Sequence, residues 1–227
     1  MFHPEHPRGC SLCDNRHSPC PVFHDIRQRT PDDIYPLLFE RTARRVLIDN
    51  SKKLWWMQQH LNSEAFSKKY IHLVRDPRGM FFSWQQRGRK TKPSHWARRT
   101  RALHEALSAS GSDSMLVLYN ELAEEPELTL QQIDRWLGLE YEPAQHEYWR
   151  LEHHGFGQNG ATLAFVPGAG GAEAFYAEKG RQPFHDLRWQ EQLDHETKTI
   201  IEEDPSVQLL LTELGLRFTK SGLKRTT

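Results

Sequence analysis

An arginine and a serine eight residues apart, Arg75 and Ser83, have the side chains and the spacing to bind a phosphate group. Arg75 follows an apolar run and precedes Pro77, which suits the first turn of a helix. The start of a helix offers free backbone N–H groups and a positive dipole end to an anion. Arg75 adds a bidentate contact, and Ser83, about two turns along, adds a hydroxyl. The pattern predicts an oxyanion site; a surface arginine beside a polar helix face is the alternative.

The elements that must position these residues alternate between strands and helices. We predict strands from short apolar runs over 45–49, 70–74 and 115–119. We predict helices over 54–61, from 77 to about 87, over 96–108 and over 128–137. Helical patterning returns from Arg188, is interrupted at Pro205, and ends near Leu216. This alternation indicates an α/β fold with a parallel sheet flanked by helices.

Polar residues follow each of the three predicted strands. They occupy 49–53, 75–79 and 119–122. In a parallel sheet covered by helices, ligands bind beyond the carboxyl ends of the strands. We therefore expect these three segments to line one edge of the sheet.

The size and charge of the chain narrow the possible functions. A length of 227 residues favours a single domain over 1–227. Lys and Arg total 30, as do Asp and Glu, and this balance argues against a nucleic-acid partner. No apolar run approaches the roughly 20 residues that span a bilayer, and residues 1–7 lack the apolar stretch of a secretory signal. We therefore expect a cytoplasmic protein without a transmembrane segment.

Two regions depart from the strand and helix pattern. Residues 1–30 are rich in Cys, His and Pro, and 155–180 is Gly-rich, which is typical of loops. Cys10, Cys13 and Cys20, with a nearby histidine, suggest zinc. Because no second pair lies at zinc-finger spacing, we expect reduced thiols and no metal, with a structural metal as the alternative.

A basic segment runs from Arg87 to Arg101. Two interpretations stand for it. It could attract an anionic donor or acceptor, or it could be a solvated helix face.

Several segments together resemble sulfotransferases that use 3′-phosphoadenosine 5′-phosphosulfate (PAPS). Residues 74–79 with Ser83 are similar to the 3′-phosphate-binding motif of that family. Further likenesses, in the same order as in the family, occur at 47–52, 96–103, 118–122, 125–127, 136–139, 153–159 and 186–189. The resemblance covers roughly 45–216 and implies a P-loop-NTPase-like fold.

The resemblance also implies a cofactor and a reaction. PAPS would donate a sulfuryl group to a hydroxyl or amine of a small-molecule or carbohydrate acceptor, and adenosine 3′,5′-bisphosphate would leave, with no metal required. Arg75 and Ser83 would hold the 3′-phosphate, and Arg181 would contribute to the same phosphate.

The resemblance leaves the catalytic groups open. Lys52 could neutralise charge that develops on the bridging oxygen, or it could belong to a solvated turn beside Lys53. The candidates for a general base are His154, Asp49 and His24. For His154 the alternative is a loop histidine without a role.

One part of the family pattern is missing. The family opens with a strand and a Gly/Ser/Arg-rich loop that binds the 5′-phosphosulfate, and nothing before Arg45 has that pattern. We therefore expect a truncated reading frame or a member that lacks this loop. The alternative function is an inactive remnant that binds a nucleotide or a partner protein. A P-loop kinase is disfavoured, because no Gly-x-x-x-x-Gly-Lys-Ser/Thr occurs.

Overall fold

The structure, a computed structural model, describes residues 20–24, 26, 29–150, 154 and 184–226. The chain divides into two compact units. Unit 1 comprises Met1–Ser67 and Glu142–Gln182, and unit 2 comprises Lys68–Tyr141 and Pro183–Thr227. The single domain over 1–227 stays a prediction.

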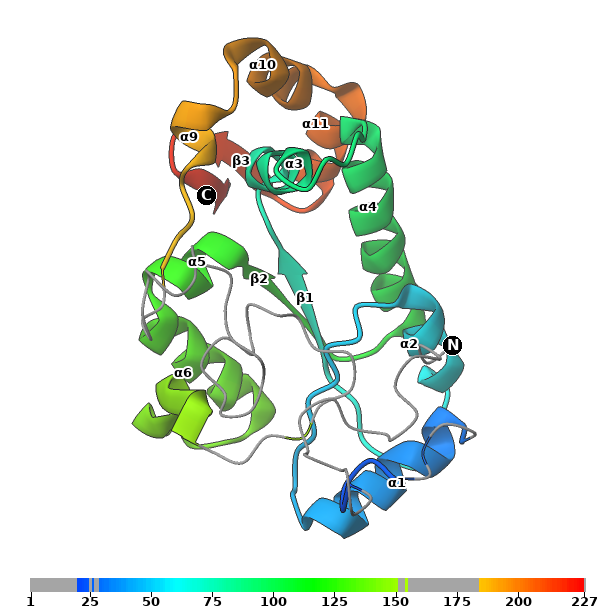
Figure 1. The fold of residues 1–227 in the computed structure, drawn as a ribbon. Helices are drawn as coiled ribbons and strands as arrows, with labels where there is room; N and C mark the ends of the chain where they lie inside the picture. Colours follow the sequence, from blue (N-terminus) through cyan, green and yellow to red (C-terminus); the bar gives the residue numbers. More distant parts are fainter. Residues whose placement is uncertain (1–19, 25, 27–28, 151–153, 155–183, 227) are drawn as a thin grey trace. The chain divides into compact units, whose positions relative to one another are not determined.

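A pair of parallel strands lies at the centre of unit 2 (Figure 1). β1 (Tyr70–Val74) pairs with β2 (Ser114–Leu118) in a register that sets Tyr70 opposite Ser114 and Val74 opposite Leu118. The prediction of a mixed α/β chain with a parallel sheet flanked by helices is confirmed at this level. β1 has the predicted bounds, whereas β2 ends one residue early because Tyr119 begins helix α5 (Tyr119–Glu124).

The helices of unit 2 begin and end at residues that satisfy free backbone groups. Asp76 caps α3 (Pro77–Gln85) by accepting a hydrogen bond from the backbone N–H of Arg78. Gly138 ends α6 with a φ of 75°, a conformation that glycine adopts without strain. The bounds of the other long helices are Pro93–Ser110 for α4 and Pro126–Leu137 for α6.

The C-terminal part of unit 2 differs from its prediction in one respect. The helices are α9 (Trp189–Gln192), α10 (His195–Glu203) and α11 (Pro205–Glu213), with the expected break before Pro205. The prediction of a chain ending in helix near Leu216 was wrong, because β3 (Leu216–Thr219) and β4 (Gly222–Arg225) form an antiparallel hairpin. Leu216 and Leu223 are buried there, so tertiary packing favours strands.

The main core joins these elements of unit 2. Phe82 from α3, Leu118 from β2 and Leu210 from α11 are at most 2 % exposed. Leu193 and Leu223 are also fully buried in the same cluster. The core therefore fixes α3, and with it the turn that carries Arg75, against the C-terminal elements.

Unit 1 contains α1 (Pro31–Thr42), α2 (Leu54–His60) and a 3₁₀ helix, η1 (Pro143–Arg150). The predicted strand over 45–49 was wrong, since this segment forms no strand and Ile48 is 89 % exposed. A strand needs a neighbour to bond its backbone, and none of the described residues pairs with this segment. The helix predicted over 54–61 is confirmed as far as His60.

Among the helices that the structure describes, none is both long enough and apolar enough to cross a membrane.

His72, in the middle of β1, makes the stability of unit 2 depend on pH. Its side chain is buried, and it stacks on His104 of α4 with ring centroids 6.1 Å apart. Burial, with a contribution from His104, lowers the pKa of His72 to about 4. In the unfolded chain a histidine titrates near its ordinary pKa of about 6.5. The unfolded state therefore binds the proton first as the pH falls, so the stability due to neutral His72 is present above that value and is lost towards pH 4.

We expect the free energy of unfolding to fall by about 3 kcal/mol through this group between pH 7 and pH 4. The measurement is urea unfolding at several pH values, compared with a His72→Leu variant that cannot be protonated. The difference between the two proteins isolates His72 from the carboxylates that titrate in the same range. Parallel pH curves for the two proteins would contradict the prediction.

Candidate functional site

Arg75 follows β1 directly and lies against the start of α5. Its guanidinium carbon lies 4.6 Å from the centroid of the Tyr119 ring, so one face of the guanidinium stacks on an aromatic face. The residue is half-buried, and its guanidinium donates no hydrogen bond to any of the described residues. The ring holds the guanidinium in place while its N–H edges stay available to a ligand.

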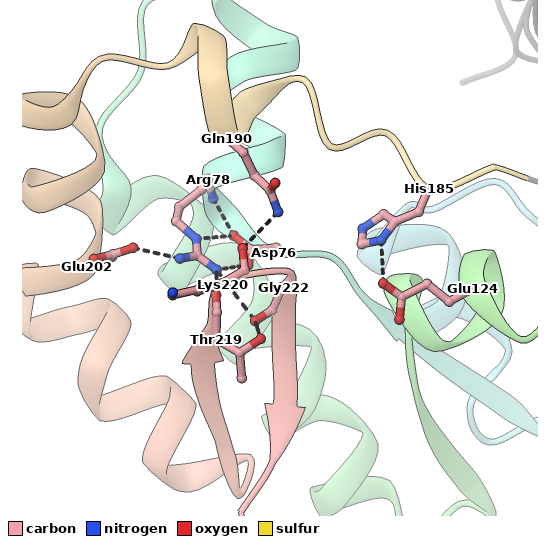
Figure 2. Close-up of polar contacts among 9 residues, drawn as sticks. All are labelled: Asp76, Arg78, Glu124, His185, Gln190, Glu202, Thr219, Lys220 and Gly222. Carbon is pink, nitrogen blue, oxygen red and sulfur yellow. Dashed lines mark hydrogen bonds and ion pairs between the residues drawn. The ribbon is translucent and has the colours of Figure 1, made fainter.

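Arg78, three residues later, has its donors fully occupied (Figure 2). Its Nε and one terminal nitrogen donate to the two carboxylate oxygens of Asp76, at 3.0 and 2.7 Å. Its other terminal nitrogen donates to Glu202 at 2.7 Å, and a further bond reaches the carbonyl of Thr219 at 2.8 Å. Arg78 therefore connects the start of α3 to α10 and to the β3–β4 hairpin.

Aromatic rings enclose the same guanidinium. The Arg78 carbon lies 4.3 Å from the ring centroid of Trp189 and 4.6 Å from that of Phe218. Desolvation opposes the charge of Arg78, but the hydrogen bonds and charges of Asp76 and Glu202 outweigh it and raise its pKa. The two arginines of the turn thus differ: Arg78 stabilises the fold, and Arg75 is the one left for a ligand.

Gly79 and Ser83 define the face of α3 along which Arg75 lies. A Cβ added at Gly79 would lie 3.6 Å from Nε of Arg75 and 3.3 Å from Cδ1 of Trp189. Ser83 comes four residues later, and residues four apart share a face of a helix. Ser83 is half-buried, and its hydroxyl makes no hydrogen bond to another described residue. Arg75 and Ser83 therefore belong to one side of one helix.

A carboxylate near Arg75 is already paired. Asp186 accepts two hydrogen bonds from Arg188, both of 2.8 Å. Burial opposes its ionisation, yet the bonds and charge of Arg188, with a smaller contribution from the charge of Arg75, lower the pKa of Asp186. Asp186 therefore stays ionised but does not occupy the donors of Arg75.

His185 is a residue of this region that sequence reasoning missed. Its Nδ1 lies 2.8 Å from a carboxylate oxygen of Glu124 (Figure 2), and its ring meets that of Tyr119 edge to face at 5.9 Å. The side chain is 10 % exposed. With Nδ1 facing a carboxylate, Nε2 is the nitrogen that can bind a ligand or a proton. Its only signal in the sequence was its position just before the segment 186–189.

Lys52 and Asp49 lie in unit 1, in the segment before α2. Lys52 is exposed and has a φ of 59°. Asp49 accepts hydrogen bonds from Tyr35, from the backbone N–H of Ser51 at 2.7 Å and from Nε1 of Trp56 at 2.8 Å. Desolvation raises its pKa, but these hydrogen bonds outweigh that effect and lower it. Asp49 therefore anchors α1 to α2 and is a weak base.

His24 and His154 both contact Cys20 in unit 1. Nδ1 of His24 lies 2.7 Å from the Cys20 carbonyl, and its Nε2 lies 3.0 Å from Arg41, so both ring nitrogens are engaged. Nδ1 of His154 lies 3.5 Å from the Cys20 sulfur. The structure thus gives His24 a role in packing the N-terminal loop.

The other predicted ligands fall outside the described residues: Cys10, Cys13, Arg181 and the Gly-rich region 155–180. In the part of the chain that the structure describes, no group of three or more His, Cys, Asp or Glu side chains could hold a metal ion.

The structure places the predicted nucleotide ligands in unit 2 and the predicted catalytic groups in unit 1. Arg75 and Ser83 lie on one side of α3, while Lys52, Asp49, His24 and His154 belong to the other unit. Comparison of the chain with protein-family models, with curated proteins and with solved structures found no match.

Proposed function

We propose that the chain is a sulfotransferase that binds the 3′-phosphate of PAPS through Arg75, with Ser83 as a second donor. The observation that carries the proposal is the state of the Arg75 guanidinium. It is stacked on Tyr119, and none of the described residues accepts its hydrogen bonds. A planar fork with free edges suits a doubly charged, tetrahedral oxyanion.

The surroundings of Arg75 support an anion at this position. The helix that follows, α3, begins two residues later and directs the positive end of its dipole to the same turn. The nearby carboxylate of Asp186 is neutralised by Arg188 and does not compete for Arg75. Backbone, side chain and local charge therefore favour the same kind of ligand.

The proposed reaction is an in-line transfer. The acceptor oxygen or nitrogen attacks sulfur, the bond from sulfur to the bridging oxygen breaks, and adenosine 3′,5′-bisphosphate leaves with the electron pair. Positioning and charge stabilisation dominate such transfers. Lys52 is the candidate to neutralise the bridging oxygen. For the base, Asp49 and His24 are less suitable than His154, because their polar atoms already bond neighbours.

A second candidate, nucleotide binding without transfer, is favoured by one observation. In the described residues the parallel sheet consists of β1 and β2, and the segment 45–49 adds no strand to it. The family resemblance implies a further strand and a loop that holds the phosphosulfate. Without that loop the chain would bind the bisphosphate end and transfer nothing.

Calorimetry and a turnover assay on the intact chain separate the two candidates. The sulfotransferase binds both PAPS and adenosine 3′,5′-bisphosphate and releases the bisphosphate when hydroxyl or amine acceptors are supplied. The remnant binds the two nucleotides about equally and shows no acceptor-dependent release. If the chain binds neither nucleotide, both candidates fail.

A further inference from the structure

Six exposed cations of unit 2 form what we define as the basic surface, on the loop after α3 and the first turns of α4. They are Arg87, Arg89, Lys90, Lys92, Arg98 and Arg99. Between Asp76 and Glu105 the chain contains eight Lys and Arg residues and no acidic residue. The chain as a whole has no net charge, so this positive charge is a local concentration.

The basic surface lacks the ion pairs that other cations of unit 2 possess. Lys69 pairs with Asp113 at 3.0 Å, and Arg101, on the same helix as Arg98, pairs with Glu213 at 2.9 Å. Among the described residues, no carboxylate pairs with any of the six cations, and Arg98 contacts only Nδ1 of His95, at 3.3 Å. A face that is merely solvated would tolerate interspersed acidic residues, as the rest of the unit does.

The position of these charges on α4 is also unfavourable without an anion. Lys92 is the N-cap residue of this 18-residue helix, its side chain makes no capping bond, and the first turn contains no acidic residue. The N-terminus of a helix is the positive end of its dipole, where cations are disfavoured. Arg99, two turns after Lys92, extends the charge about 10 Å along the same side. An extended anion would relieve this repulsion.

The basic surface is connected to the nucleotide site by one short helix. α3 begins beside Arg75 and ends at Gln85, just before the first cation of the surface. Nine residues of helix span about 14 Å. A polymer bound on the basic surface would thus have its next units within reach of the turn that holds Arg75.

The aromatic side chains nearby argue against single-stranded nucleic acid as the occupant. Trp96 is 5 % exposed, and Trp84 packs against Phe81 and His95 with centroids 5.4 and 6.2 Å away. Proteins that bind single strands offer aromatic faces on which bases stack. This surface offers charge without stacking platforms, which fits a polymer with anionic groups and no bases.

We propose that the basic surface binds an acidic polysaccharide, which serves as the acceptor of the sulfuryl group; this deepens the proposed function and rests on it. Its carboxylates would pair with the cations, while its free hydroxyls supply the nucleophile. The polymer would release counterions on binding, so its affinity should fall steeply with salt.

The test measures binding of a short, fluorescently labelled polyuronate to the full chain, without nucleotide. The variant replaces Arg89, Lys90 and Lys92 by glutamine, and the matched control replaces three exposed cations of the β3–β4 hairpin, Arg217, Lys220 and Lys224. We expect the variant to bind at least tenfold more weakly and to reduce the salt slope by about 3, one for each cation removed. The control should bind like the parent.

Three outcomes would overturn the proposal. These are no polyuronate binding by the parent, equal losses in variant and control, or tighter binding of single-stranded RNA or of anionic vesicles than of polyuronate. Because the test needs neither nucleotide nor turnover, its failure is distinct from failure of the proposed function. A chain that binds adenosine 3′,5′-bisphosphate but not polyuronate would lose this inference and keep its nucleotide site.

Discussion

Replacing Arg78 by methionine should lower the free energy of unfolding by about 3 to 5 kcal/mol, measured by urea denaturation. Methionine keeps much of the volume but removes every donor. The carboxylate of Asp76, 5 % exposed, would stay buried without its partner, and the carbonyl of Thr219 would lose a donor. Since folded domains are stable by only about 5 to 15 kcal/mol, such a loss approaches unfolding.

Two further variants separate the buried charge from simple loss of contact. Combining Arg78→Met with Asp76→Asn should recover part of the loss, because no uncompensated charge is left and the amide oxygen still caps α3. Glu202→Gln should cost less than about 1 kcal/mol, since the Glu202 side chain is 39 % exposed. If Arg78→Met costs no more than Glu202→Gln, Arg78 does not hold α3 to the hairpin.

Replacing Arg75 by glutamine should weaken binding of adenosine 3′,5′-bisphosphate about 100-fold while leaving the unfolding temperature nearly unchanged. Two hydrogen bonds from a cation to a phosphate contribute about 3 kcal/mol, which corresponds to that factor. Stability should hold because the guanidinium bonds no described residue and contributes only its stacking on Tyr119. Arg75→Lys should recover only part of the affinity, since an ammonium cannot bind in a bidentate manner.

The nucleotide provides its own control for this prediction. Adenosine 5′-monophosphate lacks the 3′-phosphate, so its weaker binding should be the same in the parent and in Arg75→Gln. Arg217→Gln, at an exposed position of β3, controls for a general loss of positive charge. A Ser83→Ala variant should lose about 2- to 10-fold for the bisphosphate. Equal losses with both nucleotides would place Arg75 at another phosphate or at none.

The strands of unit 2 show where a local pattern is sufficient. β1 has the bounds that its apolar run predicts, and α6 ends at the glycine that the sequence marks as its stop. The segment 45–49 has a similar pattern but forms no strand. A strand depends on the partner across the ladder, which lies far away in the chain and leaves no trace in the local sequence. The hairpin of β3 and β4 was missed for the same reason.

The two arginines of the turn show the same division at the level of the site. From the sequence alone, an arginine at the end of a strand and a proline at the start of a helix determined that an anion could bind near Arg75. Only the tertiary structure decided that Arg78 is consumed by Asp76, Glu202 and Thr219, and that Arg75 is not. Those partners lie up to 141 residues away. The availability of a charge depends on long-range packing, because packing brings together the groups that neutralise it.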